Sequence, residues 1–206
     1  MTKTLAITFV RNPELGKVKT RLAKTIGKHR ALEVYITLLE HTKTIMSTSN
    51  FKNAVFYSEH IPDTDLWADG QFLRFQQKGN HLGARMLHAF ETGFNGGYNR
   101  IILIGSDLPN LSVKHLNQAY NALANHEVVI GPANDGGYYL IGMNKIHAQL
   151  FKRKNWGTSS VLKETLCDSK GLDIAFLEPL NDIDTFEDLE ATTQFKFISD
   201  EYTKTY

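Results

Sequence analysis

Residues 100–109 read RIILIGSDLP, and this stretch is the clearest indication of the fold. Its first part is nearly all apolar and rich in β-branched residues, as is typical of a strand buried in a parallel sheet. Gly105 and Pro109 then favour a turn, which places Asp107 at the carboxyl end of the strand. Ligands of open α/β sheets bind at that edge, and a carboxylate there suits Mg²⁺ or Mn²⁺. Asp is also a common turn residue, so the motif alone leaves a structural role open.

Short apolar runs on both sides of this stretch predict the rest of the sheet. Strands alternating with helices predict an α/β fold with a mainly parallel central sheet covered by helices. With 206 residues and no linker or repeat, we expect a single domain over residues 1–206. Two strand-like runs after residue 131 lack an intervening helix and are expected to complete this domain. The expected strands lie near residues 4–10, 53–58, 71–76, 100–105, 127–131 and 138–143, and the helices over 29–48, over 82–94 and from about 112.

The composition excludes several classes of protein. Hydrophobic residues make up 42% and charged residues 22%, as in a globular chain. A net charge of +1 lacks the basic excess of a dedicated nucleic-acid binder. The single Cys167 cannot form an intrachain disulfide, which suits a reducing compartment, so we expect a cytoplasmic protein. No apolar run approaches the roughly 18 residues of a transmembrane helix, so we expect no membrane insertion.

The charges are distributed unevenly along the chain. Between Lys3 and Arg30 there are eight basic residues and one acidic residue, Glu14. Between Gly171 and Phe195 there are seven acidic residues and no Lys or Arg. An anionic ligand near the first segment and a cation near the second would explain this pattern, although two oppositely charged surfaces would also produce it.

The loop after the first strand reads RNPELGKVKTRL and begins at Arg11. Lys17, Lys19 and Arg21 follow Gly16, whose backbone lets a ligand approach, so the loop suits a phosphate or diphosphate. It is neither a Walker A loop nor a G-x-G-x-x-G motif. The alternative is a solvated basic turn. If Lys19 and Arg21 are exposed, replacing both by Ala should weaken nucleotide binding with little change in melting temperature.

Residues 131–142 read GPANDGGYYLIG and resemble a hairpin turn around Asp135. The density of Gly and Pro around one carboxylate and two aromatic residues also favours close approach to a ligand. Asp135 is therefore a candidate for contact with a sugar hydroxyl, for a metal ligand or for a general base. Its neighbours Gly136, Gly137 and Tyr138 are candidate substrate-binding residues.

Residues 182–189 read DIDTFEDL and offer two carboxylates two positions apart. Asp184 is the candidate metal ligand. The alternative is structural, because Asp184 and Glu187 have the spacing of a capping box at a helix start.

Five stretches occur in the order found in one known family. They are R-x-P-x-x-G-K-V-K-T-R-L, L-G-x-R-M, G-S-D-L-P-x-L, G-P-x-x-D-G-G-Y-Y-L-I-G and D-I-D-T-x-E-D-L. Over nearly its whole length the chain resembles the bacterial GT-A-fold transferases often described as radical-SAM/selenodomain-associated glycosyltransferases. The sequence departs from that pattern at His81, Ala84 and Asn110, and it has Ser-Asp-Leu where GT-A enzymes usually have Asp-x-Asp.

The resemblance implies a single GT-A-like, Rossmann-like domain of the nucleotide-diphospho-sugar transferase type. It implies a glycosyltransferase that uses a nucleotide-sugar donor, Mg²⁺ or Mn²⁺ and an unidentified small-molecule acceptor. A nucleotidyltransferase that releases pyrophosphate from a nucleoside triphosphate and a non-catalytic nucleotide-binding protein are the alternatives. The expected site comprises Arg11, Gly16, Lys17, Lys19 and Arg21 for phosphates, Asp107 and Asp184 for metal, and Asp107 and Asp135 for catalysis.

Overall fold

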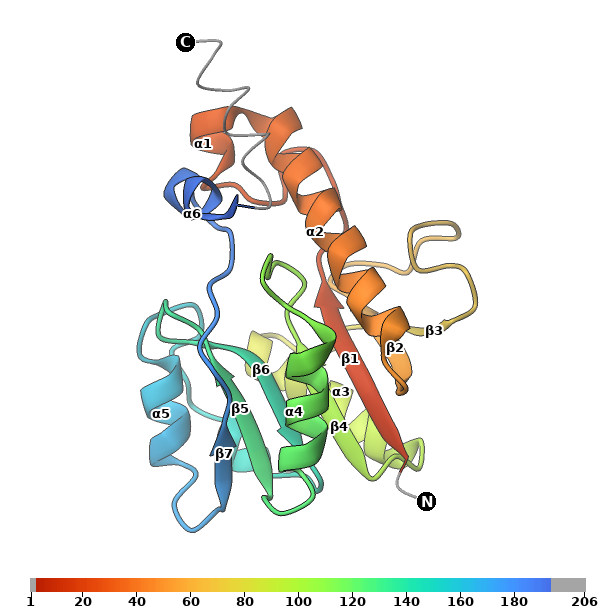
Figure 1. Cartoon of the computed structure of the whole chain (residues 1–206), viewed down its shortest axis with the longest axis vertical. Helices are drawn as coiled ribbons and strands as arrows, with labels where there is room; N and C mark the ends of the chain where they lie inside the picture. Colours follow the sequence, from red (N-terminus) through yellow and green to blue (C-terminus); the bar gives the residue numbers. More distant parts are fainter. Residues whose placement is uncertain (1–2, 194–206) are drawn as a thin grey trace.

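A seven-stranded sheet forms the centre of the molecule in the computed structural model, which describes residues 3–193 (Figure 1). The strands are ordered β3-β2-β1-β4-β6-β5-β7. Only β6 runs antiparallel to its neighbours in this sheet. The expected α/β class with a mainly parallel sheet is therefore confirmed. The strands are β1 (Thr4–Val10), β2 (Lys52–Tyr57), β3 (Phe72–Gln76), β4 (Arg100–Ile104), β5 (Val128–Pro132), β6 (Tyr138–Met143) and β7 (Ile174–Phe176).

Helices cover both faces of the sheet. On one face α2 and α4 pack through residues such as Leu39 and Leu116. On the other face α3 and η1 pack through Phe90 and Phe151. Each buried strand contributes alternate side chains to the two cores, because successive strand residues point to opposite faces. The helical segments are α1 (Ala23–Ile26), α2 (Lys28–Thr48), α3 (Leu82–Asn95), α4 (Val113–Ala122), η1 (Ala148–Phe151), α5 (Val161–Cys167) and α6 (Phe186–Ala191).

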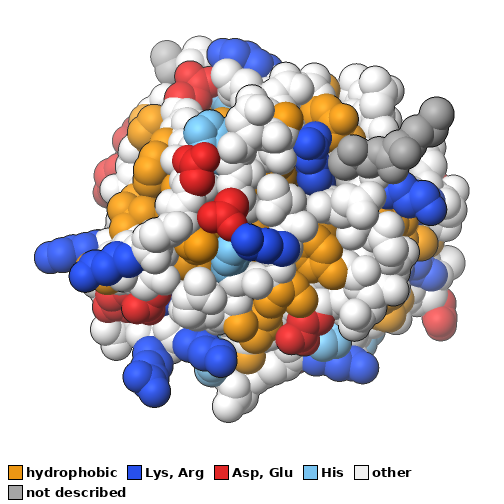
Figure 2. All heavy atoms as spheres, turned by 90° about the horizontal axis from the view of Figure 1, so that it is seen from below, with side chains coloured by type: hydrophobic (Ala, Val, Ile, Leu, Met, Phe, Trp, Pro, Cys, Tyr) orange, Lys and Arg blue, Asp and Glu red, His pale blue; other side chains and the backbone are white. Residues whose placement is uncertain are grey.

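The strands β1, β4 and β5 end at the same edge of the sheet, since they run in the same direction. Beyond this edge α1, the start of α2 and α6 form a small separate core around Leu22, Leu38 and Leu189 (Figure 1). Seen from below, the opposite end of the molecule mixes basic and acidic side chains (Figure 2). Within residues 3–193, no helix has the length and apolarity needed to cross a bilayer.

Candidate functional site

An ion pair joins the first-strand loop to the end of β4. The Lys19 ammonium lies 2.9 Å from Oδ2 of Asp107, and the Lys19 side chain is only 6% exposed. Lys19 has a left-handed backbone conformation with φ of +45°. A non-glycine residue in this conformation is uncommon, and such strain often occurs at functional sites. The structure thus brings the cationic loop and Asp107 together, as the sequence predicts.

The burial of Lys19 corrects one expectation. The expectation that Lys19 and Arg21 are both exposed holds only for Arg21, whose side chain is 69% exposed. Removing Lys19 would leave a partly buried Asp107 carboxylate without its counter-ion, which destabilises a folded protein. Replacing Lys19 is therefore expected to lower the melting temperature as well as ligand affinity.

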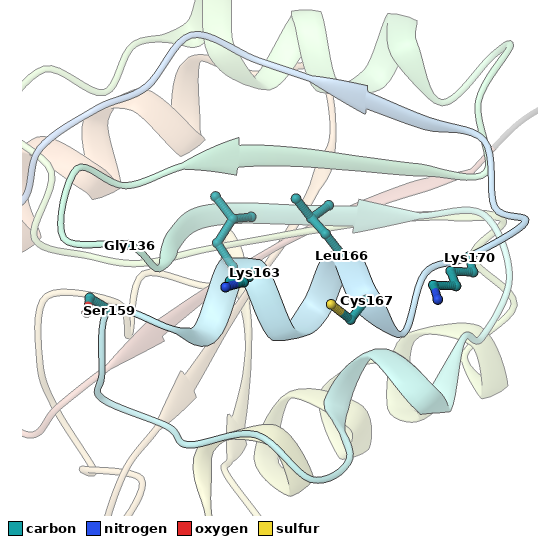
Figure 3. Close-up of a pocket in the computed structure, with 7 residues that line it drawn as sticks. Gly136, Ser159, Lys163, Leu166, Cys167 and Lys170 are labelled. Atoms are coloured by element: carbon teal, nitrogen blue, oxygen red, sulfur yellow. The ribbon is translucent and has the colours of Figure 1, made fainter.

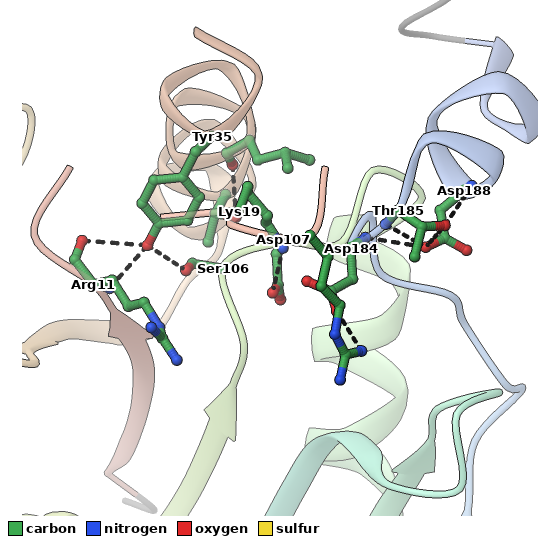
Figure 4. A network of polar contacts seen from close by, with 11 residues as sticks. Arg11, Lys19, Tyr35, Ser106, Asp107, Asp184, Thr185 and Asp188 are labelled. Carbon is green, nitrogen blue, oxygen red and sulfur yellow. Dashed lines mark hydrogen bonds and ion pairs between the residues drawn. The ribbon is translucent and has the colours of Figure 1, made fainter. Parts of the chain in front are cut away.

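Tyr35 of α2 holds the loops after β1 and β4 together (Figure 4). The backbone N–H of Arg11 donates to the Tyr35 hydroxyl at 2.8 Å, and this hydroxyl donates to the Arg11 carbonyl at 3.2 Å. The same hydroxyl lies 3.5 Å from Oγ of Ser106, next to Asp107. Burial raises the pKa of Tyr35 to about 12, so the hydroxyl keeps its proton at neutral pH. Tyr35 therefore holds the backbone of Arg11 and contacts the side chain of Ser106, one on each side of the ion pair.

Asn12 connects the same loop to the end of β2 and was not selected from the sequence. Its Oδ1 accepts from the backbone N–H of Glu59 at 3.1 Å, and its Nδ2 donates to the carbonyl of His60 at 3.0 Å. The side chain is buried. An Asn that satisfies several loop backbone groups makes the position of the cationic loop less variable.

Asp182 is one of the two carboxylates noted in residues 182–189, but it was not selected as a site residue. It lines the same cavity as Asp107 and Asp135. Burial raises the pKa of Asp182 to about 6, the negative charge of Asp107 adds to the rise, and Lys19 opposes it. The neighbouring Ile183 is buried, and its N–H donates to the Asp107 carbonyl at 3.2 Å. In the sequence, the apolar Ile183 between Asp182 and Asp184 is one indication that this segment is partly buried.

Asp184 lies on the other side of Asp107. It accepts a hydrogen bond from Nη1 of Arg21 at 2.8 Å and lines the cavity that contains the first-strand loop. Its assignment as a metal ligand stays a prediction. The expected capping box of Asp184 and Glu187 is wrong, because Thr185 has the extended backbone of the helix cap. Oδ2 of Asp188 accepts from the Thr185 N–H at 2.8 Å, so the box is shifted by one residue.

Other predicted residues belong to the β5–β6 hairpin. Oδ1 of Asp135 accepts from the N–H of Gly137 at 2.8 Å, and Asp135, Gly137 and Tyr138 line one cavity. Gly136 has φ of +89°, and a Cβ there would lie 2.2 Å from the carbonyl oxygen of Ser159. Gly136 therefore shapes the turn and lies outside that cavity.

Two cavities meet at Asp107. The first, which we call the cationic cavity, has a volume of about 630 Å³. Its carboxylates include Glu14 and Asp184, which pair with Lys17 and Arg21. The second, which we call the acidic cavity, has a volume of about 220 Å³. The cationic cavity is lined by Arg11, Lys17, Lys19 and Arg85, and the acidic cavity by Asp107, Asp135, Asp182, Phe9, Tyr138 and Trp156.

Gly16 and His81 shape the approach to the cationic cavity. Gly16 has φ of +77°, a conformation that favours glycine and turns the loop before Lys17. Nδ1 of His81 accepts from the N–H of Ala84 at 3.2 Å and caps α3. His81, which departs from the family pattern, thus keeps the N-terminus of α3 hydrogen-bonded.

A separate shallow hollow lies over α5 (Figure 3). It includes Gly136, Leu166, Lys163 and the exposed free Cys167. Cys167 is the last residue of α5. Asp107, Asp135 and Asp182 do not line this hollow, so it is distinct from the two cavities of the cleft.

A family model described as "Uncharacterized protein conserved in bacteria (DUF2064)" matches residues 40–158. The chain belongs to the DUF2064 family. No curated protein matches this DUF2064 chain. Several solved structures are similar in fold over nearly the whole chain.

One similar structure comes from Desulfovibrio desulfuricans G20 and is provisionally described as a nucleotide-diphospho-sugar transferase. It has a TM-score of 0.86 and 29% identity, covering 100% of this chain and 99% of that chain. A cytidylyltransferase from Leptospira borgpetersenii has a TM-score of 0.60 and 15% identity, covering 100% and 95%. Rv0371c of Mycobacterium tuberculosis H37Rv, in complex with manganese, has a TM-score of 0.56 and 15% identity, covering 94% and 98%. This DUF2064 chain therefore has the nucleotide-diphospho-sugar transferase fold.

Proposed function

We propose that the protein is a glycosyltransferase that uses a nucleotide-diphosphate sugar and a divalent metal ion. The observation that carries this proposal is the position of Asp107, which lines both the cationic cavity and the acidic cavity. Arg11, Lys17, Lys19 and Arg85 of the cationic cavity offer charged hydrogen-bond donors to a diphosphate. The bond that breaks would then lie beside Asp107 and face the acidic cavity. The likeness to a protein described as a nucleotide-diphospho-sugar transferase supports this reading.

The carboxylates beside this position fit a divalent cation. Asp107 lies near enough to Asp182 to raise its pKa, and a cation would relieve that repulsion. Among residues 3–193, no group of three His, Cys, Asp or Glu residues could hold a metal alone. Mg²⁺ and Mn²⁺ commonly complete their shells with substrate phosphates and water. We therefore propose Asp107 and Asp182 as protein ligands, and Asp184, already paired with Arg21, as the weaker candidate.

Each remaining group has a defined role in the proposed reaction. Lys19, Lys17 and Arg21 would offset the charge of the diphosphate, and a bound metal ion would stabilise the leaving group electrostatically. The bond between the anomeric carbon and the diphosphate oxygen breaks, and the acceptor oxygen forms the new bond. The acceptor hydroxyl loses its proton, for which Asp135 is the proposed base. The manganese complex of a fold relative supports divalent metal use.

The product decides between this proposal and its alternative. Purified protein is incubated with a panel of nucleotide sugars and Mn²⁺, and the nucleotide products are separated by chromatography. Release of a nucleoside diphosphate by the native protein, and none by Asp107→Asn, would support glycosyl transfer. If no nucleotide or nucleotide sugar stabilises the protein against heat, the proposal is wrong, because a ligand of the folded state raises its melting temperature.

A nucleotidyltransferase is the second candidate, because a cytidylyltransferase has the same fold. In that reaction an acceptor phosphate attacks the α-phosphate of a nucleoside triphosphate and pyrophosphate leaves. The same cationic loop would hold the triphosphate. Release of pyrophosphate from a nucleoside triphosphate with a phosphorylated acceptor would favour this candidate over the first.

A further inference from the structure

The acidic cavity has no Lys, Arg or His among the described residues that line it. Its charged groups are Asp107, Asp135 and Asp182. Lys19 lines the cationic cavity instead, where its ammonium lies 2.9 Å from Asp107. The lining of the acidic cavity therefore carries an excess of negative charge, which the neighbouring Lys19 offsets in part at Asp107.

Two other lysines of the neighbouring segment are directed elsewhere. Lys163 lines the hollow over α5 (Figure 3). The Lys154 side chain is fully buried, pairs with Asp168 and donates to the carbonyl of Lys152 at 3.0 Å. Neither lysine lines the acidic cavity. A phosphate group placed there would meet three carboxylates and no cationic hydrogen-bond donor from the cavity wall.

The rest of the acidic cavity is apolar and aromatic. Phe9, Tyr138, Trp156 and Met86 contribute to its wall. Trp156 is seated closely against α3, since a Cβ on Gly83 would lie 2.4 Å from its ring. A wall of this kind suits a compound with a face of C–H groups, whereas the carboxylates suit hydroxyl donors at its edge.

We propose that the acidic cavity binds an unphosphorylated, hydroxyl-rich compound, a sugar or polyol, and discriminates against phosphorylated compounds. Hydroxyl groups can donate to carboxylates, whereas a phosphate in the cavity would be repelled by them and lack a cationic partner. The volume of about 220 Å³ is smaller than a drug-sized pocket and suits one sugar-sized group. This inference rests on the proposed function and narrows its substrate class.

The compound has two sources with the same chemistry. It is either the sugar of the nucleotide donor or a hydroxyl-bearing acceptor. If the donor sugar occupies the cavity, a nucleotide sugar binds more tightly than the corresponding nucleoside diphosphate. If an acceptor occupies it, a free sugar or polyol binds to protein that already holds the nucleoside diphosphate.

The test uses matched pairs of compounds. Isothermal titration calorimetry compares glucose with glucose 1-phosphate, galactose with galactose 1-phosphate, and glycerol with glycerol 3-phosphate, with and without a bound nucleoside diphosphate. Nucleoside diphosphates are titrated alongside their hexose derivatives. Each series is run with Mn²⁺ and with EDTA, so that phosphate binding to the metal is separated from binding to the cavity wall.

A pair of variants changes the charge at one position of the cavity wall. Thr158 is exposed, lines the acidic cavity and donates to the carbonyl of Asn155 at 2.8 Å. Thr158→Lys adds a cation, and Thr158→Gln is its control, because both lose that hydroxyl hydrogen bond. Asp135→Asn removes one negative charge but keeps the oxygen that accepts from Gly137.

The expected result in the native protein is that an unphosphorylated compound or a nucleotide hexose shows specific binding. We expect the unphosphorylated compound to bind at least about tenfold more tightly than its phosphorylated partner, or the nucleotide hexose at least about tenfold more tightly than the nucleoside diphosphate. About tenfold is the scale of one strong charge contact. The ratio of the affinity for the unphosphorylated compound to that for the phosphorylated compound should be smaller in Thr158→Lys than in Thr158→Gln. It should also be smaller in Asp135→Asn than in the native protein.

Two results would overturn the inference. One is tighter binding of the phosphorylated member of a pair to native protein in EDTA. The other is no binding by any unphosphorylated compound together with equal affinity for nucleoside diphosphates and their hexose derivatives. In both cases, nucleoside diphosphate binding would leave the proposed nucleotide site intact. Absence of all nucleotide binding would instead reject the proposed function. The matched phosphorylated and unphosphorylated compounds would still be compared on protein without nucleotide.

Discussion

The cationic cavity and the acidic cavity share Asp107 but are built from different parts of the chain. The cationic cavity draws its charges mainly from the loop after β1, where Lys19 is held by Asp107. The acidic cavity combines the β5–β6 hairpin with Asp182 from the acidic C-terminal segment. The uneven charge along the sequence thus becomes an uneven charge across one cleft. Asp107 lies between the cationic cavity and the acidic cavity, and it is therefore central to the proposed reaction.

Removing the charge of Asp107 should have the largest effect on both cavities. Asp107→Asn keeps the size of the side chain but loses the carboxylate, so we expect transfer to fall by about 10² to 10³-fold. Stabilisation by a nucleoside diphosphate with Mn²⁺ should also fall sharply. Glu187→Gln, at an exposed acid on α6, is the control. An unchanged Mn²⁺-dependent melting shift in Asp107→Asn would place the metal at Asp182, Asp184 or Asp135, or remove it from the mechanism.

Two lysines of the same loop separate buried from exposed charge. Lys19→Met should weaken nucleoside diphosphate binding by about 10- to 100-fold, because a charge-assisted contact is lost in a partly desolvated place. It should also lower the melting temperature. Lys17→Met removes a side chain that is 69% exposed, and we expect the affinity for a nucleoside diphosphate to change by less than about threefold. Calorimetry measures both variants, and equal affinities in the two would show that burial of the cation is irrelevant.

Gly83→Ala should disturb the wall of the acidic cavity at Trp156. The added Cβ would lie 2.3 Å from the Phe151 carbonyl and 2.4 Å from the Trp156 ring. Such overpacking destabilises a protein by about 1 to 3 kcal/mol. Gly96→Ala is the control, because its nearest contact is 3.3 Å. Urea unfolding and tryptophan fluorescence measure the effect, and an unchanged unfolding midpoint with unchanged emission would refute the assigned contact.

The raised pKa of Asp182 predicts a smaller, pH-dependent effect. Its folded pKa of about 6 lies above the usual value, so the folded state binds this proton more strongly than the unfolded state. The contribution of Asp182 to stability should therefore fall as pH rises from about 4 to 6 when no metal is present. Asp182→Asn lacks this loss, so its melting temperature should gain a few degrees, roughly 2 to 4 °C, relative to native protein between pH 4 and 7. A difference between the two proteins that does not change with pH in EDTA would contradict the assignment.

The sheet was predictable from local patterns. The expected strands over residues 4–10 and 138–143 agree with β1 and β6, because their apolar runs are long and bounded by polar loops. β7 was not predicted, since Ile174–Phe176 spans three residues and none of them is fully buried. An edge strand of this length is specified by its neighbour β5 and leaves little periodicity in the sequence.

The site was predictable in part. Each half of the Lys19–Asp107 pair follows a predicted strand, but their contact across 88 positions depends on β1 lying beside β4. The sequence alone does not distinguish Asp182 from Asp184, since both are Asp residues next to Ile183. Their difference arises because the buried Ile183 between them bonds to the backbone of Asp107, which turns the two carboxylates toward different cavities. Such a difference requires the tertiary structure.

In the proposed reaction, Asp107 holds a metal ion between a nucleotide site and a second substrate site. The most direct test is anomalous diffraction from crystals grown with Mn²⁺ and a nucleoside diphosphate. We expect an anomalous peak at coordinating distance from an Asp107 oxygen, with the diphosphate in the cationic cavity near Lys19. A well-ordered nucleotide with its phosphates in the acidic cavity, or a manganese peak away from Asp107, would contradict it.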